Sequence, residues 1–152
     1  NVSVNLPVLV VIGAAFALGT ALEQSGTAAW LVDAMLADNI QSPWLALLLV
    51  YLVTALFTEV ITNNAAAVLM FPIATGVAEQ LGVSPLPFIV AVMFAASASF
   101  MTPLGYQTNL MVMGPGGYRF TDYLKIGVPM SLVALAVTTS LIPLIWPFQA
   151  TH

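Results

Sequence analysis

Two polar segments interrupt an otherwise apolar stretch of this 152-residue chain. The first reads Thr-Glu-Val-Ile-Thr-Asn-Asn over 58–64, and the second reads Thr-Pro-Leu-Gly-Tyr-Gln-Thr-Asn over 102–109. Thr and Asn are favoured N-caps, and helix ends expose unpaired backbone amides and carbonyls. A helix N-terminus attracts anions, whereas a C-terminus offers partly negative oxygens to a cation. The two segments therefore hold groups that could bind a small cation beside an anion.

The apolar sequence around these segments restricts what they can be. An unpaired backbone group in hydrocarbon is costly, so non-helical backbone persists there only where protein buries it or a cavity wets it. Two such breaks predict discontinuous helices that face one site, the arrangement by which secondary transporters bind solutes and ions. The alternative is that both segments are ordinary capped connections between membrane spans.

Helix capping is expected at both breaks. In the first, Thr62 or Asn63 should cap a helix that begins near Ala65. In the second, Thr108 or Asn109 should cap the short helix that follows.

Glu59 is the ionisable residue that falls most clearly at membrane depth. A carboxylate there costs about 2.5–3.5 kcal/mol on insertion scales, so it needs a partner or water. Two interpretations follow. The side chain could tune cation binding or carry a proton, or it could accept backbone amides across the break and hold its shape.

Composition predicts an integral membrane protein without enzymatic chemistry. Hydrophobic residues make up 61% of the chain and charged residues only 5%, against roughly 25% charged in soluble domains. The net charge is −4, and the only basic residues, Arg119 and Lys125, form no nucleic-acid-binding patch. There is no cysteine and only one histidine, His152, at the end of the chain. No His–carboxylate cluster, Ser–His pair or metal-ligand set supports an enzyme or a bound cofactor.

Apolar runs and turn residues predict one all-α membrane domain over 1–152. The expected elements are a helix at 6–24, an interfacial helix at 27–38, a hairpin at 43–82, a broken helix at 85–113 and a last span at 122–147. The hairpin could be two full spans or a re-entrant hairpin that turns inside the membrane. The second is favoured because its turn lacks Gly, Pro and Lys. The positive-inside rule places the loop with Arg119 and Lys125 in the cytoplasm of a multi-pass protein in the inner or plasma membrane.

The residues of both breaks resemble those of a known family. Thr-Glu at 58–59, followed by Thr-Asn-Asn-Ala at 62–65, resembles the second Ser-Asn-Thr signature of the divalent anion:sodium symporters, which carry dicarboxylates, citrate and sulfate. The small-residue run at 95–99 and the segment 100–109 also fit, and the similarity extends over about 6–146. That family folds as two inverted repeats, each with a re-entrant hairpin and a broken helix. This chain resembles the second repeat only, so an N-terminal repeat is expected in a longer protein.

The resemblance implies site residues at both breaks. Sodium ligands are expected from Thr58, Ile61, Asn63 and Gly105, the last through its carbonyl. Contacts with the anionic substrate are expected from Thr62, Asn63, Asn64, Tyr106, Thr108 and Asn109. The chain departs from the family pattern at 62 and 64, where Thr and Asn replace Ser and Thr, and at 106–108, where Tyr-Gln-Thr replaces Thr-Pro-Pro. These changes leave sulfate or another small oxyanion open beside a dicarboxylate.

The leading functional prediction is the C-terminal half of a secondary active transporter. The resemblance implies sodium-coupled uptake of a small divalent anion by a homodimer of the full-length protein, with sodium as coupling ion and no other cofactor. The alternatives are a structural or assembly subunit of a membrane complex, a channel-like pore, and a proton-coupled anion carrier that uses Glu59.

Overall fold

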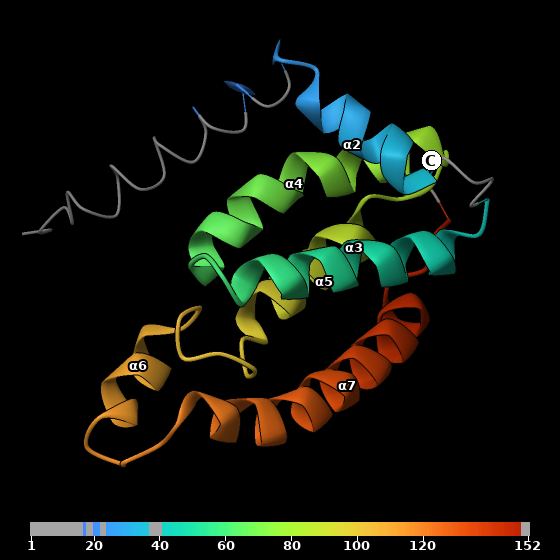
Figure 1. Ribbon diagram of the computed structural model, residues 1–152. Coiled ribbons are helices and arrows are strands. Elements are labelled where there is room, and N and C mark those ends of the chain that lie inside the picture. The colour runs from blue at the N-terminus through green and yellow to red at the C-terminus, as the bar shows by residue number, and fades with distance from the viewer. Residues whose placement is uncertain (1–16, 18–19, 22–23, 37–40, 150–152) are drawn as a thin grey trace, which may run out of the picture.

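A computed structural model describes residues 17, 20–21, 24–36 and 41–149. Every regular element in these ranges is helical, as the sequence predicts (Figure 1). The labelled helices are α2 (Thr27–Leu36), α3 (Pro43–Thr58), α4 (Asn63–Gln80), α5 (Leu86–Ser97), α6 (Gln107–Met113) and α7 (Phe120–Ile145). The helix expected at 6–24 lies mostly outside the described residues.

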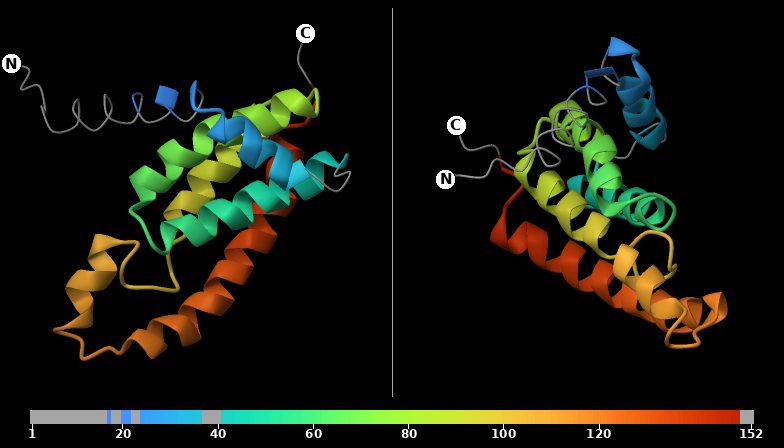
Figure 2. Two further views of the ribbon diagram at one scale, coloured as in Figure 1. Left: turned by 45° about the horizontal axis from the view of Figure 1, so that its top comes forward. Right: turned by 90° about the vertical axis from the view of Figure 1, so that its left-hand side faces the viewer.

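Helices α3, α4 and α5 form the packed centre, in which each helix packs against the other two (Figure 2). Its largest fully buried side chains include Tyr51, Leu47, Phe88, Met70 and Ile73. Proteins pack such interiors as densely as organic crystals, so the ends of these helices have little freedom to shift independently. The centre therefore fixes the loops that leave it.

Local sequence explains where these helices begin and end. Pro43 occupies the first turn of α3, where its missing amide is no loss and its fixed φ suits a helix. After α4, Gly82 adopts φ +65°, a conformation that side-chain-bearing residues rarely adopt. Pro85 then precedes α5. Helices α3 and α4 run antiparallel and are joined by residues 59–62 (Figures 1 and 2).

Helix α2 packs on the outer side of α4. The amide of Gln80 donates to the Asp33 carboxylate over 3.3 Å, and Val32 lies against Gly76. Trp30 is 67% exposed. The expected interfacial position of this helix in a membrane stays a prediction.

Helix α7 is the one described helix that is long and apolar enough to cross a membrane, with 26 residues. Helices α3 and α5 are apolar as well but shorter. α7 packs against α3 and α5 along one side, while large apolar side chains such as Leu144, Ile126 and Val133 remain exposed. This pattern suits a helix that faces lipid or further protein rather than water.

Candidate functional site

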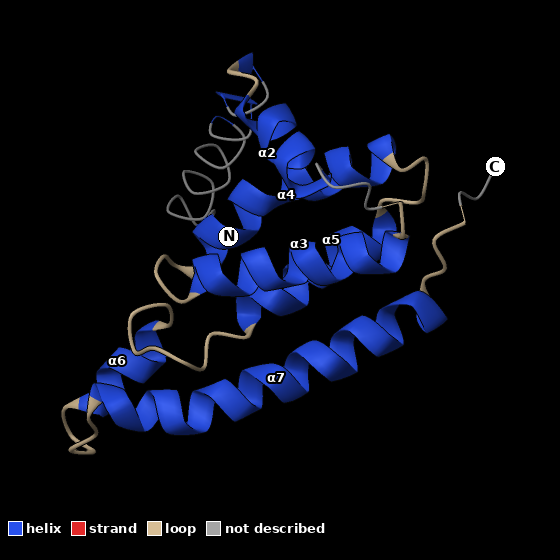
Figure 3. Ribbon diagram, turned by 45° about the vertical axis from the view of Figure 1, so that its right-hand side comes forward, coloured by secondary structure: helices blue, strands red, loops and turns tan. Residues whose placement is uncertain are grey.

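The two predicted breaks lie against each other at one end of the helical centre (Figure 3). The Ser99 hydroxyl donates to the Thr58 carbonyl over 3.2 Å, and the Thr58 hydroxyl donates to the Ala96 carbonyl over 2.7 Å. Gly105 approaches so closely that a Cβ atom there would overlap the Thr58 carbonyl oxygen. Segments distant in sequence thus form one contiguous structure, which we call the paired breaks (59–62 and 98–106).

Glu59 makes the densest set of hydrogen bonds in the paired breaks. Its side chain is buried, with 5% of its surface exposed. One carboxylate oxygen accepts the amides of Phe100 and Met101, each over 3.0 Å, and the other accepts the amide of Thr102 over 2.7 Å. The Ser99 hydroxyl lies 3.5 Å from the second oxygen. These contacts match the second interpretation of Glu59, in which its carboxylate accepts backbone amides. The amides, however, belong to the second break and not to the first break, which contains Glu59.

Thr102 bonds Glu59 at two points. Its hydroxyl donates to the Glu59 backbone carbonyl, while the amide of Thr102 bonds the Glu59 carboxylate. The same hydroxyl accepts the amides of Leu104 and Gly105 over 3.3 and 3.4 Å. Thr102 therefore links the first break to the turn that places Gly105.

A cavity of about 230 Å³ opens between the first turns of α4 and α6. Its lining is Thr62, Asn63, Asn64, Gly105, Tyr106, Gln107 and Thr108. No charged side chain belongs to this lining. Hydroxyl, amide and backbone groups are therefore the only polar contacts that the cavity wall itself offers.

Six of the residues expected in a site are thus brought together, and three are placed elsewhere. Thr58 is fully buried beneath the break, Ile61 is half-buried beside it, and neither lines the cavity. Asn109 also lies outside the lining, because its side-chain amide donates to the carbonyls of Ser99 and Thr102 over 3.0 and 3.3 Å. In the structure the Asn109 side chain therefore joins two points of the second break.

The capping prediction is correct at one break and wrong at the other. Thr62 is the N-cap of α4, and its hydroxyl accepts the amide of Ala65 over 3.4 Å. Helix α6 instead begins at Gln107, so its N-cap is Tyr106, and this residue makes no side-chain capping bond. Thr108 and Asn109 lie inside the first turn of α6. The side-chain amide of Asn109 bonds the break behind it instead of capping the helix.

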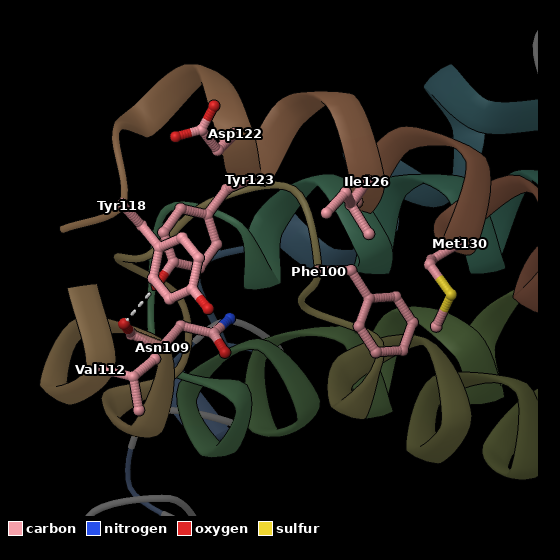
Figure 4. A pocket seen from close by; sticks show the side chains of 9 residues that line it. Phe100, Asn109, Val112, Tyr118, Asp122, Tyr123, Ile126 and Met130 are labelled. Carbon is pink, nitrogen blue, oxygen red and sulfur yellow. Dashed lines mark hydrogen bonds between the residues drawn. The ribbon is translucent and has the colours of Figure 1, made fainter. Parts of the chain in front are cut away.

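A second, larger cavity of about 550 Å³ lies between α6, α7 and the second break (Figure 4). Phe100, Val112, Ile126 and Met130 supply apolar wall, and the Tyr123 hydroxyl donates to the Asn109 carbonyl over 2.7 Å. The backbone of α7 also comes close here, since a Cβ atom on Gly127 would overlap the Phe100 carbonyl. The second break is therefore held from α7 as well as from the first break.

Sequence reasoning did not assign a role to three residues of this region. Gln107 lines the smaller cavity, while Ser99 and Thr102 join the two breaks. Ser99 and Thr102 are hydroxyl residues in the loop that follows the apolar helix α5, and this position is the only sequence feature that could have pointed to them. Their partners, however, lie in the other break, and no local pattern identifies such a partner.

Helices with apolar outer surfaces throughout the described residues, and a neutral polar cavity between two helix breaks, are features of a secondary transporter. The family model described as "Citrate transporter" matches residues 2–150. The chain belongs to this family of integral membrane transporters, which confirms the resemblance to divalent anion:sodium symporters and the prediction that it is not an enzyme.

Individual relatives agree with this assignment. The chain is 54% identical over 137 residues to "Uncharacterized transporter sll0640" of Synechocystis, covering 89% of this chain and 22% of the relative. It is 37% identical over 147 residues to "Uncharacterized transporter YfbS" of Escherichia coli, covering 96% and 24%. It is 39% identical over 132 residues to "Sodium/sulfate cotransporter 2" of Chlamydomonas reinhardtii, covering 86% and 15%. The chain therefore spans less than a quarter of the length of these relatives.

Proposed function

We propose that this chain belongs to the C-terminal repeat of a secondary active transporter that takes up a small divalent anion, sulfate or a dicarboxylate, together with sodium. Relatives named as sodium/sulfate cotransporters support the sulfate and sodium parts of the proposal. Because the chain spans a small part of those relatives, the activity belongs to the longer protein. An N-terminal repeat supplies the rest of the site, and the full-length protein is a homodimer. Sodium is the coupling ion, and no further cofactor takes part.

The observation that carries this proposal is the neutral polar cavity between the paired breaks. It lies at the N-terminus of α4, an 18-residue helix whose dipole favours a negative charge there. Thr62, Asn63 and Asn64 line the cavity on the side of α4, and Tyr106 and Thr108 line it on the side of α6. An anion can enter such a site without meeting a carboxylate on its wall. Asn109 contributes by fixing the second wall rather than by touching the anion.

Sodium binds in this proposal to oxygen atoms where the two breaks meet. Thr58 and Asn63 offer side-chain oxygens, while Ile61 and Gly105 offer carbonyls. Hard oxygen ligands suit a hard cation. The close approach of Gly105 to the Thr58 carbonyl supports this arrangement because it brings the backbones of the two breaks together.

The proposed membrane arrangement follows from the same paired breaks. Helices α3 and α4 form a re-entrant hairpin, and α5 and α6 are the two parts of a discontinuous helix. The loop with Arg119 and Lys125 is cytoplasmic. A cysteine introduced at Asn64 tests the hairpin, because this segment has no native cysteine. Labelling at 64 from the side opposite Pro43 and Gly82 would mean two full spans.

Uptake by the full-length protein in proteoliposomes tests the function. Labelled sulfate and succinate are offered in sodium and in choline buffer, with Asn63→Ala as the site variant. We expect uptake only in sodium and a loss of at least tenfold in the variant. Gln80→Ala is the matched control, since this amide lies at the far end of the same helix and bonds Asp33. Equal uptake in both buffers would reject sodium coupling, and no uptake would favour an assembly subunit.

A further inference from the structure

Glu59 is a buried carboxylate that lines neither cavity, so the proposed function gives it no direct contact with the anion. Its hydrogen bonds all run to the second break. Three successive backbone amides on one carboxylate form a compact anion-binding concavity. In this protein the anion that occupies the concavity is a side chain of the chain itself. The second break therefore takes its shape around Glu59.

The bonds continue from Glu59 to the cavity wall. The Glu59 carboxylate fixes the amide of Thr102, and the Thr102 hydroxyl both donates to the Glu59 carbonyl and accepts the amide of Gly105. Gly105 is itself a lining residue, and Tyr106 follows it in the same wall. The opposite wall begins at Thr62, which lies on the same short loop as Glu59. The loop 59–62 thus leads directly into the wall at 62–64, and through Glu59 it also fixes the wall at 105–108.

We propose that Glu59 and Thr102 are positioning residues that set the separation between the two walls of the smaller cavity, in which the anion binds according to the proposed function. They fix the wall at 105–108 against the wall at 62–64 without contacting the anion. This inference rests on the proposed function for its effect on uptake, but its structural part does not. Glu59 acts here as a fixed acceptor of backbone amides and neither carries a proton nor binds sodium.

The two residues allow substitutions that separate geometry from simple loss of folding. Glu59→Gln keeps the size of the side chain but replaces one acceptor oxygen with a donor group, so at least one backbone amide loses its bond. Thr102→Val keeps the shape and removes the hydroxyl, whereas Thr102→Ser keeps the hydroxyl. Thr102→Val leaves the carboxylate in place, so it still tests the proposal if Glu59→Gln fails to insert.

The first measurement is the distance between spin labels at Asn64→Cys and Thr108→Cys in the full-length protein, one label on each wall. In Glu59→Gln and Thr102→Val we expect a longer or broader distance distribution than with the native residues. Thr102→Ser should keep the native distribution. This measurement needs no transport activity, so it stands even if sodium-coupled uptake is rejected. Unchanged distributions in both disruptive variants would overturn the proposal.

The second measurement is the KM and maximal rate of sulfate uptake at saturating sodium, per correctly inserted protein and without labels. A displaced wall should raise the KM about tenfold in Glu59→Gln, the scale expected when the shifted wall loses one hydrogen bond to the anion. Thr102→Val should shift it in the same direction and Thr102→Ser should restore it. Lower protein yield with native KM would mean a role in folding alone. Native distances with loss of sodium dependence would mean that Glu59 is a sodium ligand. Either result would contradict the inference.

Discussion

The two helix breaks of this protein are built in different ways. The first spans residues 59–62 and is closed by local bonds, since Thr62 caps the helix that follows it. The second spans 98–106; the side chains of Glu59 and Asn109 form hydrogen bonds with it, and Gly127 packs closely against it. The second break thus depends on Glu59 and Gly127, which belong to other elements, in addition to Asn109 of the helix that follows it.

This difference assigns distinct roles to the two walls of the small cavity. The wall at 62–64 continues directly into α4, which is packed into the centre. The wall at 105–108 continues into α6, which has no buried residue. The first wall is therefore the fixed reference, and the second is the part that a substitution or a bound ligand can displace. Each of the following predictions tests this contrast.

The largest effect is expected from Gly105→Ala. A Cβ atom at this position overlaps the Thr58 carbonyl and the Ser99 hydroxyl, and a buried backbone carbonyl cannot move away cheaply. The second wall must shift, so uptake by the full-length protein should fall at least a hundredfold with normal membrane insertion. Gly114→Ala is the control, because a Cβ atom there meets nothing within 4 Å. Normal uptake by Gly105→Ala would show that the two breaks need not touch.

A smaller effect is expected from placing a carboxylate at Asn109. Asn109→Asp replaces the amide that donates to two backbone carbonyls with an acceptor that repels them. The expected cost is about 2 kcal/mol of stability, seen as a lower thermal midpoint in detergent. Asn63→Asp should cost far less, since Asn63 uses its oxygen to accept the amide of Asn64, and a carboxylate does the same. Equal losses in the two variants would mean that the breaks are held alike.

Much of this architecture follows from local sequence, because local chemistry determines it. Pro43 and Gly82 mark helix ends by their own backbone preferences, and Thr62 caps a helix through the amide of Ala65 nearby in the chain. The composition determines the membrane class in the same way, since so few charged residues cannot cover a soluble globule.

The contacts between the breaks lie beyond such reasoning. The two breaks look equivalent as sequence, with Thr-Asn pairs that precede apolar residues. Asn109 nevertheless faces backward onto the carbonyls of Ser99 and Thr102, because that turn leaves these groups without helical partners. The partners of Glu59 are backbone amides distant in sequence, and every residue but proline carries one. A pattern of side-chain types therefore cannot identify them.

The smallest effect is expected from removing the cap of α4, and it tests whether the first break is held locally. Thr62→Ala loses the hydroxyl that accepts the Ala65 amide, which costs about 1 kcal/mol at a typical N-cap. Thr62→Ser should keep the native thermal midpoint, because serine caps at least as well as threonine. Hydrogen exchange should accelerate in Thr62→Ala at 63–66 but not at 100–102, where the Glu59 carboxylate still holds the amides. Faster exchange at 100–102 would mean that the first break also depends on its cap to clamp the second, and the contrast between a fixed wall and a displaceable wall would then fail.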